Sequence, residues 1–231
     1  MQNVVVSGAN RGIGLGLVER YLEQGWRVLA GVRDMSRCVD LQDLSQNGDL
    51  QIHLLDVTND DSVASFAAWV MSTTCSIDVL MNNAGIMDDR AHHLENVDIE
   101  YSRNVLDVNV LGPLRLTKAL LPALKEGGAA KVGNISSLMG SIADNRSGGY
   151  YAYRASKTSV NMITMSMSRD LLDEGITAVA LHPGWVRTDM GGPNGAIDVE
   201  ASTHGLFAVM EGLEASDGGS FIQWDGTKLP W

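Results

Sequence analysis

Short apolar runs alternate along the chain with longer segments in which apolar residues recur every three or four positions. A nearly continuous apolar run is typical of a strand buried on both faces, and the longer period is typical of a helix with one buried face. The predicted strands are Asn3–Ser7, Arg27–Val32, Gln51–Asp56, Val79–Asn82, Lys131–Ser136, Thr177–His182 and Ser220–Gln223. The predicted helices cover about 12–24, 60–72, 98–125, 151–174 and 199–213, with a short one near 36–46.

This alternation predicts βαβ units and a parallel sheet. Gly25, Gly127, Gly128 and Gly175 fall where the predicted helices should end. No linker, repeat or low-complexity tract interrupts the pattern, and 231 residues suit one domain with a sizeable core. We therefore expect a single α/β domain: a Rossmann-like, doubly wound parallel sheet of about seven strands with helices on both faces.

Composition narrows the class of protein. The net charge of −11 argues against a nucleic-acid or anionic-membrane partner, because both need a basic surface. The only cysteines, Cys38 and Cys75, have neither CxxC nor Cys/His spacing, and the adjacent His92 and His93 lack ligand spacing. The first residues do not resemble a signal peptide, and no apolar run approaches the ~18 residues of a membrane span. We expect a soluble, cytoplasmic protein without a metal site.

The first predicted strand leads directly into SGANRGIG, residues 7–14, where a helix begins. Glycines permit a tight turn and a close approach of backbone to a pyrophosphate, and a helix N-terminus attracts its negative charge. A glycine-rich turn also serves close strand–helix packing, so the glycines alone are weak evidence. Their place between a strand and a helix favours a nucleotide site.

Two further motifs lie where such a fold would use them. Asn82–Gly85 follows the fourth predicted strand, at the sheet edge where open α/β sheets bind ligands. Tyr153 and Lys157 are four positions apart, which places them on one face of a helix. A phenol titrates near ~10, and a neighbouring ammonium should lower that pKa. The rival tyrosines Tyr150 and Tyr151 have no lysine four residues later.

Together these motifs resemble the short-chain dehydrogenase/reductase family, over nearly the whole chain. The resemblance implies a catalytic group of Asn109, Ser137, Tyr153 and Lys157. Tyr153 would be the general acid or base, Ser137 would hydrogen-bond the substrate oxygen, and Asn109 would support a proton relay. A longer segment before Tyr153 leaves open whether Ser136 or Ser137 points inward. His182 is rejected as the acid/base because it ends a strand.

The resemblance also implies a nicotinamide cofactor. Its implied contacts are Gly8, Asn10, Arg11, Gly12, Ile13, Gly14, Arg33, Asp56, Val57, Asn83, Ala84, Gly85, Tyr153, Lys157, Pro183, Gly184, Val186 and Thr188. Val32 stands where enzymes using NAD(H) usually have an acid, and Asp34 is better explained as a helix cap. Arg11 and Arg33 offer cations for a 2′-phosphate, so NADP(H) is expected and NAD(H) is less favoured. The nucleotide part would cover about 1–135, and the catalytic and substrate part about 136–231.

Segments 149–157, 188–192 and 224–227 are similar to Sniffer-type carbonyl reductases and bacterial C-factor proteins. This implies an NADP(H)-dependent oxidoreductase of carbonyl reductase or alcohol dehydrogenase type, acting on a small or medium apolar carbonyl or alcohol. The pocket residues would be Leu138, Met139, Trp185 and Met190, under a loosely closing segment 191–198. The alternative is a cofactor-binding signalling or regulatory protein without physiological turnover.

The family resemblance further implies a homodimer or homotetramer. Its contacts would come from the helices predicted at 98–125 and 151–174. Met162, Met165 and Met167 would add adaptable apolar surface to the second helix, although each of them could equally belong to the core.

Overall fold

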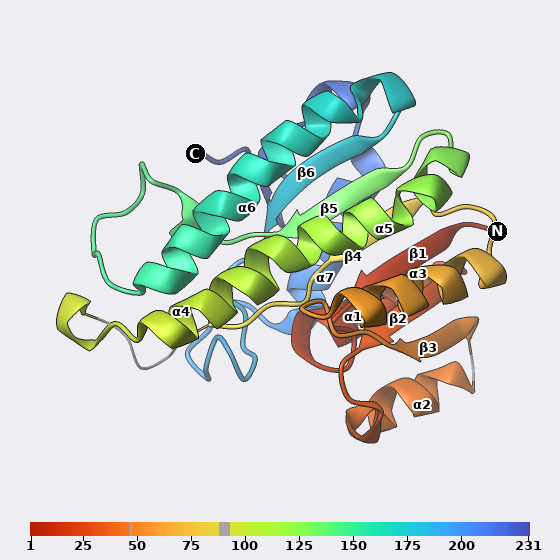
Figure 1. Cartoon of the computed structure of the whole chain (residues 1–231), viewed down its shortest axis with the longest axis horizontal. Coiled ribbons are helices and arrows are strands. Elements are labelled where there is room, and N and C mark those ends of the chain that lie inside the picture. Colours follow the sequence, from red (N-terminus) through yellow and green to blue (C-terminus); the bar gives the residue numbers. More distant parts are fainter. Residues whose placement is uncertain (47, 88–92) are drawn as a thin grey trace.

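A computed structural model of the chain describes residues 1–46, 48–87 and 93–231. Its strands form one sheet in the order β3-β2-β1-β4-β5-β6-β7, and every neighbouring pair is parallel (Figure 1). Their bounds are β1 Asn3–Ser7, β2 Arg27–Val32, β3 Leu50–Leu54, β4 Val79–Asn82, β5 Lys131–Ile135, β6 Thr177–His182 and β7 Phe221–Gln223. The predicted fold class is confirmed.

Helices cover both faces of this sheet (Figure 1). One face carries α1 Gly12–Glu23, α2 Val39–Ser45 and α7 Val199–Gly212, and the other carries α3 Asp60–Thr73, α4 Ile99–Leu106, α5 Gly112–Glu126 and α6 Tyr151–Asp170. Such coverage explains why the strands are apolar without alternation: every residue of β1, β4 and β6 is buried.

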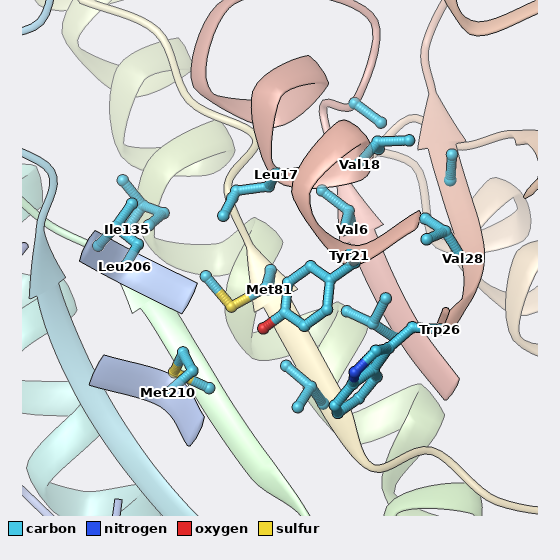
Figure 2. Close-up of a cluster of buried hydrophobic side chains, with 14 of the residues drawn as sticks. Val6, Leu17, Val18, Tyr21, Trp26, Val28, Met81, Ile135, Leu206 and Met210 are labelled. Carbon is cyan, nitrogen blue, oxygen red and sulfur yellow. The ribbon is translucent and has the colours of Figure 1, made fainter. Parts of the chain in front are cut away.

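Each face has its own hydrophobic core. Figure 2 shows the core on the α1 side, where Leu17 and Val18 of α1 lie with Val6 and Val28 of the sheet. Tyr21 packs edge-on against Trp26, with ring centroids 5.1 Å apart. This packing fixes α1 on the sheet, and with it the glycine loop from which α1 begins.

The predicted helix 98–125 is present from Ile99 to Glu126, but it is not α-helical throughout. α4 ends at Leu106, and a π-helical segment, Asp107–Leu111, separates it from α5. Pro113 has no amide hydrogen, so it cannot make the α-helical bond to the carbonyl of Asn109 four residues earlier. π turns are uncommon and often accompany functional sites. The predicted helix 151–174 is likewise shorter, because α6 ends at Asp170 and a 3₁₀ turn, Leu172–Glu174, follows.

Candidate active site

The glycine loop and the segment after β4 are held together by the hydroxyl of Ser7, which ends β1. Ser7 Oγ accepts hydrogen bonds from the amides of Asn83 (3.0 Å) and Ala84 (3.1 Å) and donates to the carbonyl of Met81 (3.4 Å). The Asn83 side chain donates back to the carbonyls of Ser7 (3.0 Å) and Gly8 (3.1 Å). These five bonds join two loops more than seventy residues apart at the carboxyl edge of the sheet.

Close contacts explain why glycine is needed in this loop. Gly8 has φ +64°, and a Cβ there would lie 2.9 Å from the Cα of Ala84. A Cβ on Gly14 would lie 2.2 Å from the carbonyl oxygen of Gly8. Gly12 has φ +53° and faces Thr188. The loop backbone is thus drawn against two other loops at the first turn of α1, the arrangement that suits a pyrophosphate.

Asn109 lies in the π segment and is buried. Its amide oxygen accepts from the backbone amide of Ile86 (2.8 Å), and its amide nitrogen donates to the Ile86 carbonyl (2.8 Å) and to Ser156 Oγ (3.0 Å). Ser156 in turn donates to the carbonyl of Tyr153 (2.7 Å). Asn109 therefore ties the loop after β4 to the first turns of α6.

Tyr153 and Lys157 are both buried on α6, whereas Tyr151 is 44% exposed. Lys157 Nζ lies 5.6 Å from the centroid of the Tyr153 ring and donates to the carbonyl of Ile135 (2.8 Å). A Cβ on Gly85 would lie 3.6 Å from Lys157 Nζ and 3.3 Å from Asn109 Oδ1. The structure thus brings Gly85, Asn109, Tyr153 and Lys157 to one place.

The prediction that Lys157 lowers the pKa of Tyr153 is wrong, because the effect of burial is larger. Burial raises the pKa of Tyr153 to about 12, and the hydrogen bond with Ser137 only partly opposes this. Burial also lowers the pKa of Lys157 to about 8. Desolvation disfavours the charged form of both groups, and the ammonium points its hydrogen bond at a backbone carbonyl. Tyr153 is accordingly protonated at neutral pH.

The two serines after β5 have different environments. Ser136 Oγ donates to Asn161 Oδ1 (2.6 Å) and approaches the Lys157 carbonyl (3.3 Å), so it fastens β5 to α6. Ser137 caps a short 3₁₀ turn through the amide of Met139 (3.1 Å), and its side chain hydrogen-bonds Tyr153. The serine that faces Tyr153 is Ser137.

Two of the residues expected to contact the adenosine part of a cofactor, Arg33 and Asp56, follow the neighbouring strands β2 and β3. Asp56 Oδ1 accepts from the amide (2.9 Å) and hydroxyl (2.7 Å) of Thr58, which fixes the turn that contains Val57. Asp34 caps a 3₁₀ turn by accepting from the Ser36 amide (2.9 Å), as predicted. Asn10 donates to the carbonyl of Arg37 (3.2 Å), which places this turn beside the glycine loop.

The two arginines expected near a 2′-phosphate differ. Arg33 is exposed at the end of β2. Arg11 forms an ion pair with Asp189 (2.8 Å), in which both side chains are more than half exposed. A carboxylate therefore competes for Arg11, which makes Arg33 the stronger candidate. Ile13 packs against the core on the α1 side and contributes to the site through its place in the first turn of α1.

The segment after β6 is well connected. The carbonyl of Pro183 accepts a hydrogen bond from the Ser202 hydroxyl (2.7 Å). Gly184 has φ +89° and packs beside Trp224. Val186 is buried, and Thr188 Oγ1 accepts from the amide of Gly191 (3.1 Å).

The prediction that segment 191–198 closes loosely is wrong. Ile197 pairs with Trp185 and Arg187 through backbone bonds of 3.1 and 2.9 Å, and Arg187 also binds the carbonyl of Gly195 (3.0 Å). The structure describes a pinned segment. Leu138, Met139, Trp185 and Met190 are each at least partly open to solvent.

The histidines considered in the sequence analysis differ in burial. His182 ends β6 in a buried position, and burial lowers its pKa to about 4. His93 is exposed, and His92 lies outside the described residues. Within residues 1–46, 48–87 and 93–231, no group of His, Cys, Asp and Glu could hold a metal ion. The same ranges contain no helix long and apolar enough to cross a membrane.

Sequence reasoning missed two parts of this site. Ser156, which links Asn109 to Tyr153, carried no motif signal beyond its place between Tyr153 and Lys157. In the sequence Ser7 stood only for the end of the first strand and the start of the glycine loop, and its contacts after β4 could not be inferred from spacing. The only sequence signal for these contacts was a hydroxyl-bearing residue, Ser7, immediately before the first glycine of the loop.

Comparison with known proteins agrees with this geometry. Residues 2–196 match the family model described as short chain dehydrogenase. The chain is 45% identical over 158 residues to the C-signal of Myxococcus xanthus, covering 68% of this chain and 95% of that protein.

Two solved structures cover all of this chain. Carbonyl reductase from chicken fatty liver, bound to NADPH, has a TM-score of 0.94 at 38% identity, and 99% of it is covered. Carbonyl reductase Sniffer of D. melanogaster has a TM-score of 0.95 at 36% identity, and 100% of it is covered. The resemblances predicted from sequence are confirmed.

Proposed function

The chain belongs to the short-chain dehydrogenase family, and on that premise we propose that it is an NADP(H)-dependent carbonyl reductase. The observation that supports this most directly is the assembly of Asn109, Ser137, Tyr153 and Lys157 beside Gly85. These residues come from four separate segments, and helix or loop packing alone does not require Tyr153 and Lys157 to be buried together. Tyr153, Ser137, Lys157 and Asn109 are proposed as the catalytic group.

The residues at the carboxyl edge of the sheet suit the parts of NADP(H). Backbone amides at the start of α1 would bind the pyrophosphate. Neighbouring backbone atoms leave no room for a side chain at Gly8 or Gly14, so none stands between these amides and the cofactor. Asp56 and Val57 would bind the adenine, and Arg33 would bind the 2′-phosphate. Lys157, Val186 and Thr188 would orient the nicotinamide end. The cofactor, when bound, supplies the hydride.

In reduction, Tyr153 donates its phenolic proton to the carbonyl oxygen of the substrate. A raised pKa keeps this proton in place at neutral pH until negative charge develops on that oxygen. Ser137 hydrogen-bonds the same oxygen and stabilises the charge. Lys157, when protonated, stabilises the tyrosinate that remains, and the buried Asn109 keeps the loop after β4 in place beside Lys157.

The proposed substrate is a small or medium apolar carbonyl compound. Trp185 is 57% exposed and Met190 is 40% exposed, and Leu138 and Met139 follow Ser137 directly. These side chains offer contact area but no charge to hold a polar substrate. Pockets of this kind separate homologues by only ~1–3 kcal/mol per methylene, which favours broad specificity.

The similarity to C-signal favours a second candidate, a cofactor-binding signalling protein without physiological turnover. Such a protein would use the nucleotide site but would have no need of a buried Tyr153. The two candidates therefore differ in one measurable property, which is turnover that depends on the tyrosine hydroxyl.

The test is to follow NADPH absorbance against aliphatic aldehydes, aromatic ketones and quinones, with Tyr153→Phe and Tyr151→Phe as matched variants. Tyr153→Phe keeps the ring volume, so folding and NADPH binding should survive while kcat falls by roughly 10²–10⁴-fold. Tyr151→Phe, on the exposed side of α6, should leave kcat unchanged. NADPH binding without turnover of any carbonyl would support the signalling candidate, and an active Tyr153→Phe variant would refute the mechanism.

We also propose a homodimer or homotetramer built on the α4, α5 and α6 side. Leu111 is 44% exposed, Leu114 42% and Met162 67%, so apolar surface gathers on these helices. Met167 does not contribute, because it is buried in the core beneath α6. Light scattering at micromolar concentration should return at least twice the chain mass, and a monomer would contradict the proposal.

A further inference from the structure

Arg115, in the first turn of α5, joins two regions that are far apart in the sequence: the loop after β3 with the start of α3, and the π segment that runs into α5. Its Nε forms an ion pair with Asp60 of α3 (2.9 Å), and its Nη1 forms one with Asp107 of the π segment (2.7 Å). Nη1 also donates a hydrogen bond to the carbonyl of Val57 (3.2 Å). The Arg115 side chain is 25% exposed. One largely buried guanidinium is therefore the meeting point of α3, the π segment and the loop after β3.

The contact with Val57 fixes the loop after β3 against α5. A Cβ on Gly112 would lie 2.9 Å from Val57 Cγ2, so helix and loop already touch at this point. The guanidinium adds a hydrogen bond to the Val57 carbonyl and an ion pair to Asp60, three residues further along. Arg115 thus contacts this region at two points, the Val57 carbonyl and the Asp60 carboxylate, next to the residues proposed to bind adenine.

The contact with Asp107 acts on the other end of the site. Asp107 begins the π segment, and Asn109 lies two residues later. A π turn is wider and rarer than an α turn, so its shape depends on the groups that hold it. Inside the turn, Asn109 is held by the Ile86 backbone and Ser156. The ion pair between Asp107 and Arg115 links the first residue of the π segment to α5. This pair is a charge contact without hydrogen-bond geometry.

Arginine suits this position for a physical reason. Its planar guanidinium directs several N–H groups outward at fixed angles, so it can meet a carbonyl and two carboxylates together. A lysine ammonium is a compact point charge and would favour one of these partners. The Asp107 side chain is 37% exposed and the Asp60 side chain 87%, so water screens the Asp60 pair more strongly, and the connection of both carboxylates through one guanidinium is what sets them apart from isolated surface pairs.

We propose that Arg115 is a positioning residue that couples the adenine-side loop to the Asn109 turn. Binding of the adenosine end of the cofactor and proton transfer near the nicotinamide end then depend on the same side chain. This inference rests on the proposed function and adds to it a residue that touches neither cofactor nor substrate.

The test compares Arg115→Met with Arg103→Met in the full chain. Arg103 makes an exposed ion pair with Glu100 inside α4 and links no separate segments among the described residues, so it is the matched control. Calorimetry measures the Kd of 2′,5′-ADP, which reports on the adenine side alone, and kcat is measured at saturating NADPH. Arg115→Met should raise this Kd and lower kcat by about fivefold or more each, because both depend on alignment. Arg103→Met should change neither by more than about twofold.

Variants that remove only one carboxylate partner of Arg115 separate a positioning role from a loss of general stability. Asp60→Asn should raise the Kd of 2′,5′-ADP and leave kcat unchanged, whereas Asp107→Asn should lower kcat and leave this Kd unchanged. Combining Arg115→Met with Asp107→Asn should lower kcat no further than Arg115→Met alone, since both remove one interaction. If Arg115→Met does not fold, the two aspartate variants decide the matter through the same split.

The possible outcomes are distinct. Wild-type protein that binds neither NADPH nor 2′,5′-ADP overturns the proposed function. Wild-type binding with an unchanged Kd and kcat in Arg115→Met, or a lowered melting temperature alone, overturns only the role of Arg115. The Kd comparison needs no turnover, so it also decides the adenine-side part in a protein that binds NADPH without reducing any tested carbonyl.

Discussion

Replacing Ser7 by alanine tests whether one hydroxyl joins the two loops of the cofactor site. Ser7 is 1% exposed, and its Oγ is bonded to the amides of Asn83 and Ala84 and to the carbonyl of Met81. The change removes a single oxygen and leaves the strand and its apolar contacts intact. Any loss of stability or affinity therefore reports on those bonds.

The magnitude follows from what each partner retains. The Asn83 amide also bonds the Met81 carbonyl (3.0 Å), so it loses only a second acceptor, whereas no other acceptor is recorded for the Ala84 amide within the described ranges. An unpaired buried amide costs about 1–3 kcal/mol, and an ordinary hydrogen bond contributes about 0.5–1.5 kcal/mol. The expected loss is about 2–4 kcal/mol in the free energy of unfolding, which corresponds to roughly 4–16 °C in Tm at this chain length.

Urea unfolding and calorimetric titration with NADPH measure the two consequences. Ser7→Ala should lower the urea midpoint without changing the m-value and should weaken NADPH binding, because the loop after β4 is no longer tied to the glycine loop. Ser7→Thr keeps the hydroxyl and should restore most of both properties. Ser45→Ala removes an exposed hydroxyl that, among the described residues, bonds the Gln42 carbonyl alone, and it should change neither the urea midpoint nor NADPH binding. A Ser7→Ala protein within about 0.5 kcal/mol of wild type would refute the reasoning.

Three further predictions concern buried and charged side chains. Tyr21 is fully buried, and its hydroxyl has no hydrogen-bond partner among the described residues. Tyr21→Phe should therefore raise the free energy of unfolding, measured by urea titration, by up to about 1–3 kcal/mol. A loss of stability would show that the hydroxyl has a partner. Figure 2 shows this ring inside the apolar cluster, on the Met81 side. Burial lowers the pKa of Lys157 to about 8, so the side chain is charged below that pH and neutral above it. The kcat/KM for carbonyl reduction should therefore fall as pH rises through about 8. A flat profile to pH 10 would contradict the proposed role of the Lys157 charge. Arg33→Ala should raise KM for NADPH about tenfold or more and leave KM for NADH nearly unchanged, with equal effects on both cofactors contradicting the 2′-phosphate assignment.

Much of the fold followed from local patterns. Strands covered on both faces must be apolar throughout, so runs such as Val4–Val6 and Thr177–His182 marked buried parallel strands with nearly correct bounds. Tyr153 and Lys157 could be paired from their spacing, because four residues make about one helical turn. Asp34 could be identified as a cap for an equally local reason.

Features that depend on long-range contacts were not predictable. The π segment at Asp107–Leu111 lies inside the predicted helix, and the position of Asn109 depends on its hydrogen bonds to the distant Ile86 backbone and to Ser156. The raised pKa of Tyr153 was missed because spacing reveals a neighbouring lysine but not the burial that outweighs it. The pinned segment 191–198 was missed because its bonds to Trp185 and Arg187 leave no periodic signal.

The sequence by itself determined the order of strands and helices along the chain, the glycine loop and the residues that could carry the chemistry. Those properties depend on backbone geometry and on spacing within one or two turns, which neighbouring residues set. The tertiary structure decided that Ser137 rather than Ser136 faces Tyr153, that Asp189 competes for Arg11, and that Arg115 joins α3, α5 and the π segment. Hydrogen bonds and ion pairs between distant segments depend on where the packed sheet places each loop, and on how much water that packing removes.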